Sequence, residues 1–157
     1  LIGTTGLSPQ TLDITEVAAR RIPVLVAPNT SRGVAVLTRL VVEAARLLGD
    51  QYDVNLIELH HIHKQDAPSG TALRIADQMR REAGVDLPAD RIHAIRSGDI
   101  VGEHIVEFAA PGERLTFRHL ATDRDLFARG ALQLAAWLTG REPGRYTIDH
   151  AFDSSTR

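Results

Sequence analysis

The segment from residue 60 to residue 72, HHIHKQDAPSGTA, brings together several side chains that could carry out chemistry. His60, His61 and His63 stand close together, and Lys64 follows them directly. An imidazole gains or loses a proton near neutral pH, and a lysine ammonium offers a positive charge and three hydrogen-bond donors. These residue types at this spacing therefore predict acid-base chemistry beside a bound anion.

The anion would bind at the start of a helix. Residues 68 to 71, PSGT, are typical of a helix N-terminus, where the backbone N–H groups of the first turn attract negative charge. Gly70 would let a ligand approach the backbone closely. With Lys64 just upstream, a carboxylate or phosphate could be held by a cation and a helix terminus together. Two simpler interpretations stay open: Ser69 could be a plain N-cap, and Asp66 could orient the lysine or cap the turn.

A metal site is the alternative hypothesis for the histidines, since imidazole is a good zinc ligand. Neighbouring residues of a strand point to opposite faces, so at most His61 and His63 could share one ion. The chain has no cysteine, and any further ligands would have to be histidines or carboxylates. We favour acid-base chemistry and predict no metal. For His63 and for the isolated His93, His104 and His119, a structural role is the simpler interpretation.

The elements around this segment have to position it. Residues 52 to 63, YDVNLIELHHIH, predict a strand, and His60 and His61 at its end would point to opposite sides. One face of that strand would carry Val54, Leu56 and Glu58. Residues 69 to 84 predict a helix that ends at Gly84. The histidines would therefore lie between a strand and a helix.

Two other short segments also follow predicted strands. Leu1-Ile2 leads into GTTG, and the buried strand within residues 22 to 29 leads into APNT, with a helix predicted in between. This order is a βαβ unit. Open α/β sheets bind ligands at the C-terminal ends of their strands, so both segments are candidate ligand contacts. Neither motif is specific by itself, and GTTG could also be a tight turn.

The remaining elements complete the order. Residues 33 to 50 predict a helix that stops at Gly49, with an apolar face that includes Val36, Leu40 and Leu47. The stretch from residue 91 to residue 121 predicts a β-meander, and residues 124 to 140 predict a closing helix in which Trp137 packs. The tail after this helix is short and polar. Parallel and antiparallel parts together suggest two subdomains.

Composition excludes several classes of partner. The chain has 157 residues, of which 43% are hydrophobic, enough for a core. The net charge of −2 and the 4% of aromatic residues give no basic or base-stacking surface for nucleic acid, so small molecules are the expected partners. No apolar run is long enough for a membrane helix, and residues 1 onward do not look like a signal peptide. We therefore expect a soluble cytoplasmic protein.

Taken together, four strings resemble one known family. GTTG, APNTSRGV, ELHHIHKQDAPSGTA and SGDIVGEH occur in the order and at about the spacing found in dihydrodipicolinate reductase, an enzyme of lysine and diaminopimelate biosynthesis. The resemblance implies the remnant of a Rossmann-like parallel sheet, in residues 1–30 and 125–157, joined to an α+β substrate-binding and oligomerisation domain with a mixed, largely antiparallel sheet, in residues 31–124. The strings GVDLPAD and RIHAIRSGD adjoin almost directly, where the family usually has a longer loop rich in Gly and Arg.

The resemblance also implies roles for individual residues. His60 resembles the family's proton donor or acceptor, and Lys64 its second proton donor. The substrate contacts would be His61, Gly70 and Thr71, with the helix start holding a carboxylate. The segments beside the nicotinamide would be Gly3, Thr4 and Thr5 together with Ala27, Pro28, Asn29 and Thr30. A dicarboxylate needs cationic and backbone donors, which agrees with the interpretation of the residues themselves.

The activity implied is the reduction of 4-hydroxy-tetrahydrodipicolinate to tetrahydrodipicolinate by NADPH or NADH, in a homotetramer. No G-x-G-x-x-G precedes Gly3, so we expect the chain to lack the N-terminal half of the cofactor-binding domain. The alternative is a non-catalytic dicarboxylate-binding or oligomerisation module derived from that enzyme. Turnover of reduced nicotinamide distinguishes the two.

Overall fold

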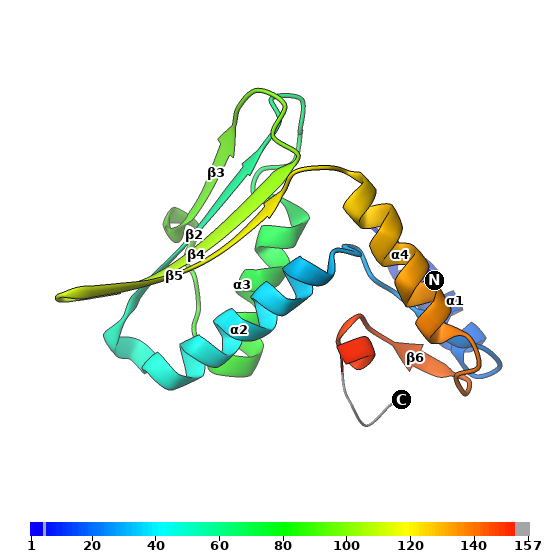
Figure 1. The fold of residues 1–157 in the computed structure, drawn as a ribbon. Coiled ribbons are helices and arrows are strands. Elements are labelled where there is room, and N and C mark those ends of the chain that lie inside the picture. The colour runs from blue at the N-terminus through cyan, green and yellow to red at the C-terminus, as the bar shows by residue number, and fades with distance from the viewer. Residues whose placement is uncertain (5, 153–157) are drawn as a thin grey trace. The chain divides into compact units, whose positions relative to one another are not determined.

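The computed structural model describes residues 1–4 and 6–152. The chain forms two compact units (Figure 1). The first consists of residues 1–35 and 125–157, and the second of residues 36–124. The predicted α/β fold class, with a small parallel sheet and a separate mixed sheet, is confirmed.

The first unit is built on a short parallel sheet. Strand β1 (Pro23–Leu25) pairs in parallel with β6 (Gly144–Tyr146), and Ile2 forms a single parallel bridge with Val26. Helix α1 (Pro9–Ala19) begins at Ser8, whose hydroxyl accepts a hydrogen bond from the Thr11 backbone N–H at 3.1 Å. Helix α4 (Asp125–Leu138) and the 3-10 helix η3 (Asp149–Phe152) complete the unit. Its core consists of Leu25, Ala27, Ala35, Leu134, Leu138 and Ile148.

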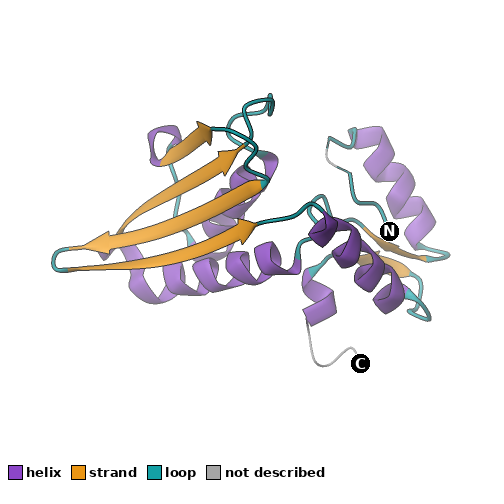
Figure 2. Cartoon of the chain, turned by 45° about the horizontal axis from the view of Figure 1, so that its top comes forward, coloured by secondary structure: helices purple, strands orange, loops and turns teal. Residues whose placement is uncertain are grey.

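The second unit is a four-stranded mixed sheet in the order β3-β2-β4-β5 (Figure 2). Strand β2 (Asp53–His60) is parallel to β3 (Ile92–Arg96) and antiparallel to β4 (Gly102–Ala110), which forms a hairpin with β5 (Glu113–Ala121). The parallel edge matters for function, because it brings the C-terminal ends of β2 and β3 to the same edge of the sheet.

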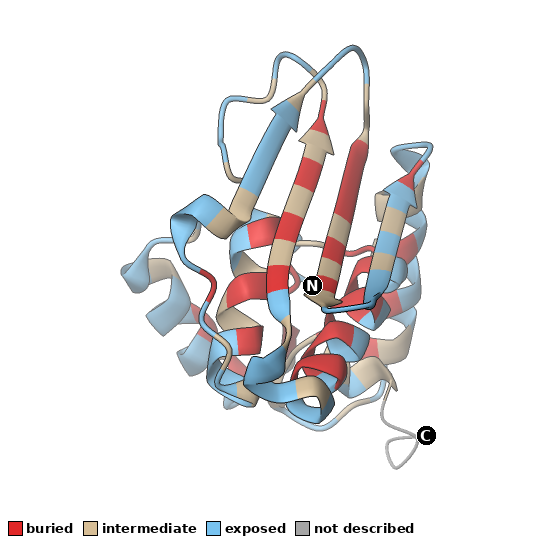
Figure 3. Ribbon diagram, turned by 90° about the vertical axis from the view of Figure 1, so that its left-hand side faces the viewer, coloured by how far each residue is buried: buried red, intermediate tan, exposed pale blue. Residues whose placement is uncertain are grey.

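Two helices cover one face of this sheet. These are α2 (Arg32–Leu48), from residue 36 onward, and α3 (Gly70–Ala83), with the short 3-10 helices η1 (Gly49–Gln51) and η2 (Ala89–Arg91) in the connections. Buried and half-buried positions alternate along the central strand β2, whereas the edge strands are mostly exposed (Figure 3). The buried residues include Val41, Leu56, Ile75, Met79, Val106 and Phe108.

Three predictions from the sequence were wrong in detail. The β-meander does not form, because β3 pairs with β2 and only β4 and β5 are a hairpin. The polar tail contains a strand, β6, which is stabilised by its pairing with β1. The face of α2 that carries Val36, Leu40 and Leu47 is exposed, and the helix packs through Leu37, Val41, Val42, Ala44 and Ala45 instead.

Other predictions are confirmed. Helix α3 begins after Ser69, whose hydroxyl accepts a hydrogen bond from the Ala72 backbone N–H, and it ends at Gly84 in the left-handed conformation. Helix α2 ends just before Gly49, and Trp137 packs with its ring edge against Tyr146. Among the described helices, none combines the length and apolar character that crossing a membrane requires.

Candidate functional site

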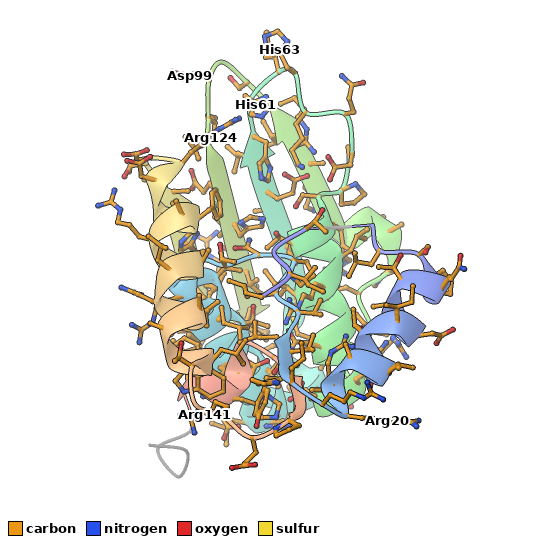
Figure 4. The ribbon with its side chains drawn as sticks, turned by 90° about the vertical axis from the view of Figure 1, so that its right-hand side faces the viewer. Arg20, His61, His63, Asp99, Arg124 and Arg141 are labelled. Carbon is orange, nitrogen blue, oxygen red and sulfur yellow. The ribbon has the colours of Figure 1, made fainter. Side chains whose placement is uncertain are left out.

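The histidine segment lies at the C-terminal ends of the two parallel strands of the second unit. The loop after β2 and the loop after β3 are joined by hydrogen bonds from the Ile62 N–H to the Gly98 carbonyl (3.2 Å) and from the Ser97 N–H to the His60 carbonyl (2.9 Å). Figure 4 shows His61, His63 and Asp99 on these neighbouring loops. The site is therefore positioned by backbone contacts between two loops at one sheet edge.

His60 is the last residue of β2 and lies on the buried face of the strand. Its Nδ1 makes a short hydrogen bond with a carboxylate oxygen of Glu58, two residues earlier on the same face. Its Nε2 makes no hydrogen bond within the described residues. A Cβ at Gly102 would lie 3.1 Å from Nε2, so glycine at this position keeps space beside that nitrogen.

Glu58 is a fully buried carboxylate that is satisfied on every side. The Arg96 guanidinium donates to both carboxylate oxygens, at 3.0 and 2.8 Å, and the Ser69 backbone N–H donates to one of them at 3.1 Å. Burial alone would raise the pKa of Glu58, but the hydrogen bonds from Arg96 and His60 outweigh it, and the pKa lies below its usual value. The buried group is therefore an ionised carboxylate.

The protonation of His60 follows from these contacts. Burial lowers the pKa of His60, and the bond to Glu58, which acts in the opposite direction, does not cancel this effect. The charges of Lys64 and Arg96 lower it further. At neutral pH the ring is therefore neutral, with its proton on Nδ1 donated to Glu58 and the lone pair of Nε2 open.

Lys64 already holds a carboxylate, that of Asp66. The Lys64 Nζ lies 2.7 Å from Asp66 Oδ1, and the Gly70 backbone N–H donates to Asp66 Oδ2 at 3.3 Å. The Lys64 side chain is 23% exposed and that of Asp66 is 55% exposed, so the pair lies at the surface. The ammonium and the first turn of α3 therefore act on the same carboxylate, the geometry expected of the anion site, and Asp66 both orients the lysine and caps the turn.

The other predicted substrate contacts lie nearby in the loop and the first turn of α3. His61 is half-buried and His63 is exposed, with ring centroids 6.3 Å apart. Thr71 is half-buried next to Gly70. Within residues 1–4 and 6–152, no three histidine, cysteine or carboxylate side chains are arranged to hold a metal ion.

His104 is a buried histidine beside the site. Its Nε2 lies 3.4 Å from the Ser69 hydroxyl, and its ring meets the His60 ring edge-on with centroids 5.4 Å apart. In the part of the chain that the structure describes, its Nδ1 has no hydrogen-bond partner. Burial, with a smaller contribution from His60, lowers the pKa of His104 to about 4. The side chain is a neutral packing element at physiological pH.

The predicted cofactor segments come together in the first unit. The Ala27 N–H donates to the Ile2 carbonyl at 2.9 Å, and a Cβ at Gly3 would meet the Thr30 methyl at 3.7 Å. Ala27 and Thr30 are buried, and the Thr30 hydroxyl donates to the Phe127 carbonyl at 2.7 Å. The residues that remain accessible are Gly3, Thr4 and Pro28, with Asn29 half-buried. Thr5 lies outside the described residues.

Helix α4 approaches this segment closely. A Cβ added at Gly130 would lie 2.0 Å from the Thr30 carbonyl oxygen. Any residue other than glycine would therefore force the helix and the segment apart. The backbone of residues 27–30 is fixed by this contact and by the Thr30 hydroxyl.

Sequence reasoning missed Glu58, Arg96 and Gly130. A carboxylate on the apolar face of a predicted strand, two residues before a histidine, was a signal for Glu58. Arg96 gave no signal, because its place depends on the parallel pairing of β3 with β2. Gly130 reads as an ordinary helix residue until α4 is packed against the Thr30 carbonyl.

Known proteins share both the sequence and the fold. The 4-hydroxy-tetrahydrodipicolinate reductase of Anaeromyxobacter dehalogenans (strain 2CP-1) is 46% identical over 166 residues, which cover 94% of this chain and 61% of the relative. The reductase of the same name from Cereibacter sphaeroides (strain KD131) is 47% identical over 165 residues, with the same shares. The chain thus spans about three fifths of the length of these curated relatives.

A solved structure has the same fold. The dipicolinate-bound dihydrodipicolinate reductase from Paenisporosarcina sp. TG-14 superposes with a TM-score of 0.76 over 97% of this chain and 63% of that chain, at 24% identity. Residues 33–152 match the family described as dihydrodipicolinate reductase, C-terminus. Since this match covers most of the chain, the chain belongs to the dihydrodipicolinate reductase family.

Proposed function

We propose that the protein containing this chain reduces 4-hydroxy-tetrahydrodipicolinate to tetrahydrodipicolinate with NADPH or NADH. The observation that carries the proposal is the contact of Asp66 with both Lys64 and the Gly70 N–H. It is a carboxylate held by an ammonium and a helix N-terminus, which is what a dicarboxylate substrate requires. The name shared by the curated relatives supports the same reaction.

In this proposal, one substrate carboxylate displaces Asp66 from Lys64 and from the first turn of α3. Asp66 is exposed and can move into water, whereas Glu58 is buried and cannot. Gly70 admits the ligand to the backbone, because nothing lies within 4 Å of a Cβ placed there. His61 and Thr71 flank this position and are our proposed further contacts.

The reduction adds a hydride and a proton to the substrate and releases water, so the site must move protons. Lys64 carries a proton on its ammonium and is our proposed donor. Loss of water from the substrate breaks its C–OH bond and a neighbouring C–H bond. His60 presents the open lone pair of Nε2, accepts the proton of that C–H bond, and is then an imidazolium stabilised by the Glu58 carboxylate. The two residues thus cover both directions of proton transfer.

We assign the first unit to the dinucleotide-binding domain and the second to substrate binding and assembly. NADPH or NADH supplies the hydride when bound. Gly3, Thr4 and Pro28 are exposed and Asn29 is half-buried at the ends of parallel strands, and their small side chains suit contact with a flat ring. Ala27 and Thr30 would act indirectly, because their side chains are buried and hold the segment in place.

The test of the activity is direct. The protein containing this chain, mixed with 4-hydroxy-tetrahydrodipicolinate and reduced nicotinamide, should consume both in equal amounts and form tetrahydrodipicolinate. Binding of dipicolinate without any turnover would instead favour the non-catalytic dicarboxylate-binding module. Absence of both would reject the site.

Lys64 is the only lysine of the chain, which allows a second test of the anion site. A reagent that methylates amines should modify Lys64, and saturating dipicolinate should protect it, because the ligand carboxylate covers the ammonium. A neutral diamide of dipicolinate is the control for charge. Isophthalate, which has both carboxylates but lacks the ring nitrogen, is the control for that nitrogen. Equal modification with and without dipicolinate would exclude Lys64 from the binding site.

We also propose that the second unit assembles the protein into a homotetramer through the face of the sheet opposite α2 and α3. Strand pairing places Ile57 beside Ile105, and Leu59 beside Ile95. Leu120 is 51% exposed and Ile95 is 44% exposed on this face, which also carries the Glu103–Arg118 ion pair. Exposed apolar side chains bordered by polar ones mark protein interaction sites.

Ile105→Asp tests the assembly. It should convert the tetramer to smaller species in sedimentation analysis, because a charged side chain would lose its hydration in the contact between subunits. Leu47→Asp is the control, since Leu47 is 77% exposed on α2. A monomeric parent protein, or an unchanged tetramer in Ile105→Asp, would reject this surface.

A further inference from the structure

The side chains behind His60 form a buried hydrogen-bond network that the proposed reaction does not use directly. We propose that Glu58 and Arg96 are positioning residues that hold His60 as its Nδ1–H tautomer and present Nε2 as the atom that carries the proton. The proposal rests on the proposed function in one respect only, that the proton carried by Nε2 takes part in the reduction. The geometry of the three side chains carries the rest.

The first step is the location of the carboxylate. Glu58 and His60 lie two residues apart on the same face of β2, so the strand itself aims the carboxylate at Nδ1. Glu58 is completely buried, so water does not compete for the hydrogen bond. An ionised carboxylate accepts hydrogen bonds only, and it therefore requires the proton on Nδ1.

The second step is the role of Arg96. Its two Nη atoms donate to the two carboxylate oxygens of Glu58, which fixes the plane of the carboxylate and compensates its charge. Without that cation a buried carboxylate would bind a proton, and a neutral acid could donate to Nδ1 and reverse the tautomer. Arg96 therefore ensures that His60 Nδ1 donates this hydrogen bond and that the Glu58 carboxylate accepts it.

The third step links both proposed proton carriers. The Nη2 atom of Arg96 also donates to the Asp66 carbonyl at 2.6 Å, in the loop where the Asp66 side chain contacts Lys64. One guanidinium thus fixes the acceptor of the His60 proton and the loop that carries Lys64. The charged and titratable groups that face His60 are Glu58 on β2, Lys64 in the loop, Arg96 on β3 and His104 on β4.

Two features show that this network differs from an ordinary ion pair of the sheet. Glu103 on β4 is also a buried carboxylate paired with an arginine, Arg118, at 2.5 Å. Among the described residues, no hydrogen bond or ion pair joins that pair to a histidine, and Arg118 is 59% exposed. Arg96 is only 17% exposed, so its cost of burial is larger. Its two Nη atoms offset this cost through bonds to Glu58 and to two backbone carbonyls, whereas its Nε has no partner within the described residues.

The experiment measures the tautomer first. In the protein labelled with nitrogen-15, the His60 ring signals, identified by their loss in His60→Gln, should report protonated Nδ1 and bare Nε2 at neutral pH. This measurement uses the unaltered protein and needs no turnover. Protonated Nε2 as the main neutral form would overturn the proposal, whatever the catalytic result.

The variants then test the cause. Glu58→Gln should mix the two tautomers, move the acid limb of the kcat profile to lower pH, and lower kcat about tenfold to a hundredfold with little change in dipicolinate affinity. Glu103→Gln is the matched control and should change stability without changing the His60 signals or the pH profile. If Glu58→Gln behaves as Glu103→Gln does, Glu58 is structural and the proposal is wrong.

Arg96→Lys covers the case in which Glu58→Gln does not fold. The lysine keeps the positive charge but cannot bind both oxygens of Glu58, so the proportion of the Nε2–H tautomer should rise and kcat should fall. It also loses the bond to the Asp66 carbonyl in the loop that carries Lys64, so KM should increase. An unchanged tautomer ratio and unchanged KM in folded Arg96→Lys would overturn the role of the arginine. A wild-type protein with the Nδ1–H tautomer but no reductase activity would reject the proposed function and leave the positioning role intact.

Discussion

The two units position their candidate site residues in different ways. In the second unit, charged side chains from two strands and a loop meet the backbone N–H groups of a helix start at the C-terminal edge of a mixed sheet, where Lys64 and Glu58 each have a defined partner. In the first unit, the candidate segments consist of small residues whose backbone is held by close packing, with Gly130 against the Thr30 carbonyl.

This difference predicts different responses to mutation. A charge network can lose one member and leave the fold in place, so damage in the second unit should appear mainly in rate or affinity. A segment positioned by close packing has no side-chain chemistry to lose, so damage in the first unit should appear mainly in stability.

The largest expected effect is that of Lys64→Ala. Removing the ammonium deletes a charge-assisted contact to the substrate and a proton donor, so kcat/KM should fall about a hundredfold or more. Thermal unfolding should change little, because the Lys64–Asp66 pair lies at the surface. Arg81→Ala, which removes an exposed cation from α3, is the control for net charge. Full activity in Lys64→Ala would place the site elsewhere.

The next effect is the acid sensitivity caused by His104. Burial lowers the pKa of this imidazole from 6.5 to about 4, so the unfolded chain binds a proton at a higher pH than the folded chain does. The neutral, buried ring therefore makes its full contribution to the free energy of unfolding above about pH 6.5. As the pH falls toward 4, that contribution is lost, by up to about 3 kcal/mol. In urea unfolding, the free energy of unfolding of His104→Leu should fall less across this pH range than that of the parent protein.

The exposed His93 is the control for that measurement, and His93→Leu should keep the acid sensitivity of the parent protein. If His104→Leu loses as much stability on acidification as the parent does, another group governs the response. The experiment would then show that the buried face of the second unit tolerates a charge at position 104.

Gly130→Ala should have an intermediate effect, on stability. The added Cβ meets the Thr30 carbonyl oxygen at 2.0 Å, so the helix or the segment has to shift, at a cost of about 1–3 kcal/mol in the free energy of unfolding. Leu132→Ala on the same helix is the control, because Leu132 is 72% exposed. A Gly130→Ala protein as stable as the parent would mean that residues 27–30 are not fixed by packing.

The smallest effect concerns the carboxylate already present in the anion site. Asp66→Asn should remove the negative charge that pairs with Lys64 and leave one acceptor oxygen in place of two, and affinity for dipicolinate should rise about two- to fivefold, as expected for loss of an exposed ion pair. Titration calorimetry with Asp77→Asn as the control measures this. Weaker binding would show that Asp66 aligns Lys64 for the ligand and does not compete with it.

Local patterns in the sequence were sufficient for the elements that carry the candidate site. Helix α3 follows from Ser69 and Gly84 at its ends, and β2 follows from its alternation, because both signals depend on neighbours in the chain. The approach of Lys64 to the helix start follows from the short loop between them. These contacts span few residues, so little tertiary information is needed to predict them.

The sequence alone therefore determined that a cation, histidines and a helix N-terminus lie together, because they are consecutive in the chain. Only the tertiary structure decided that β3 joins β2 in parallel and brings Arg96 to Glu58, that β6 pairs with β1, and which face of α2 is buried. Strand order and close backbone approach depend on residues far apart in the sequence. Their energies come from pairing and packing that no local pattern records.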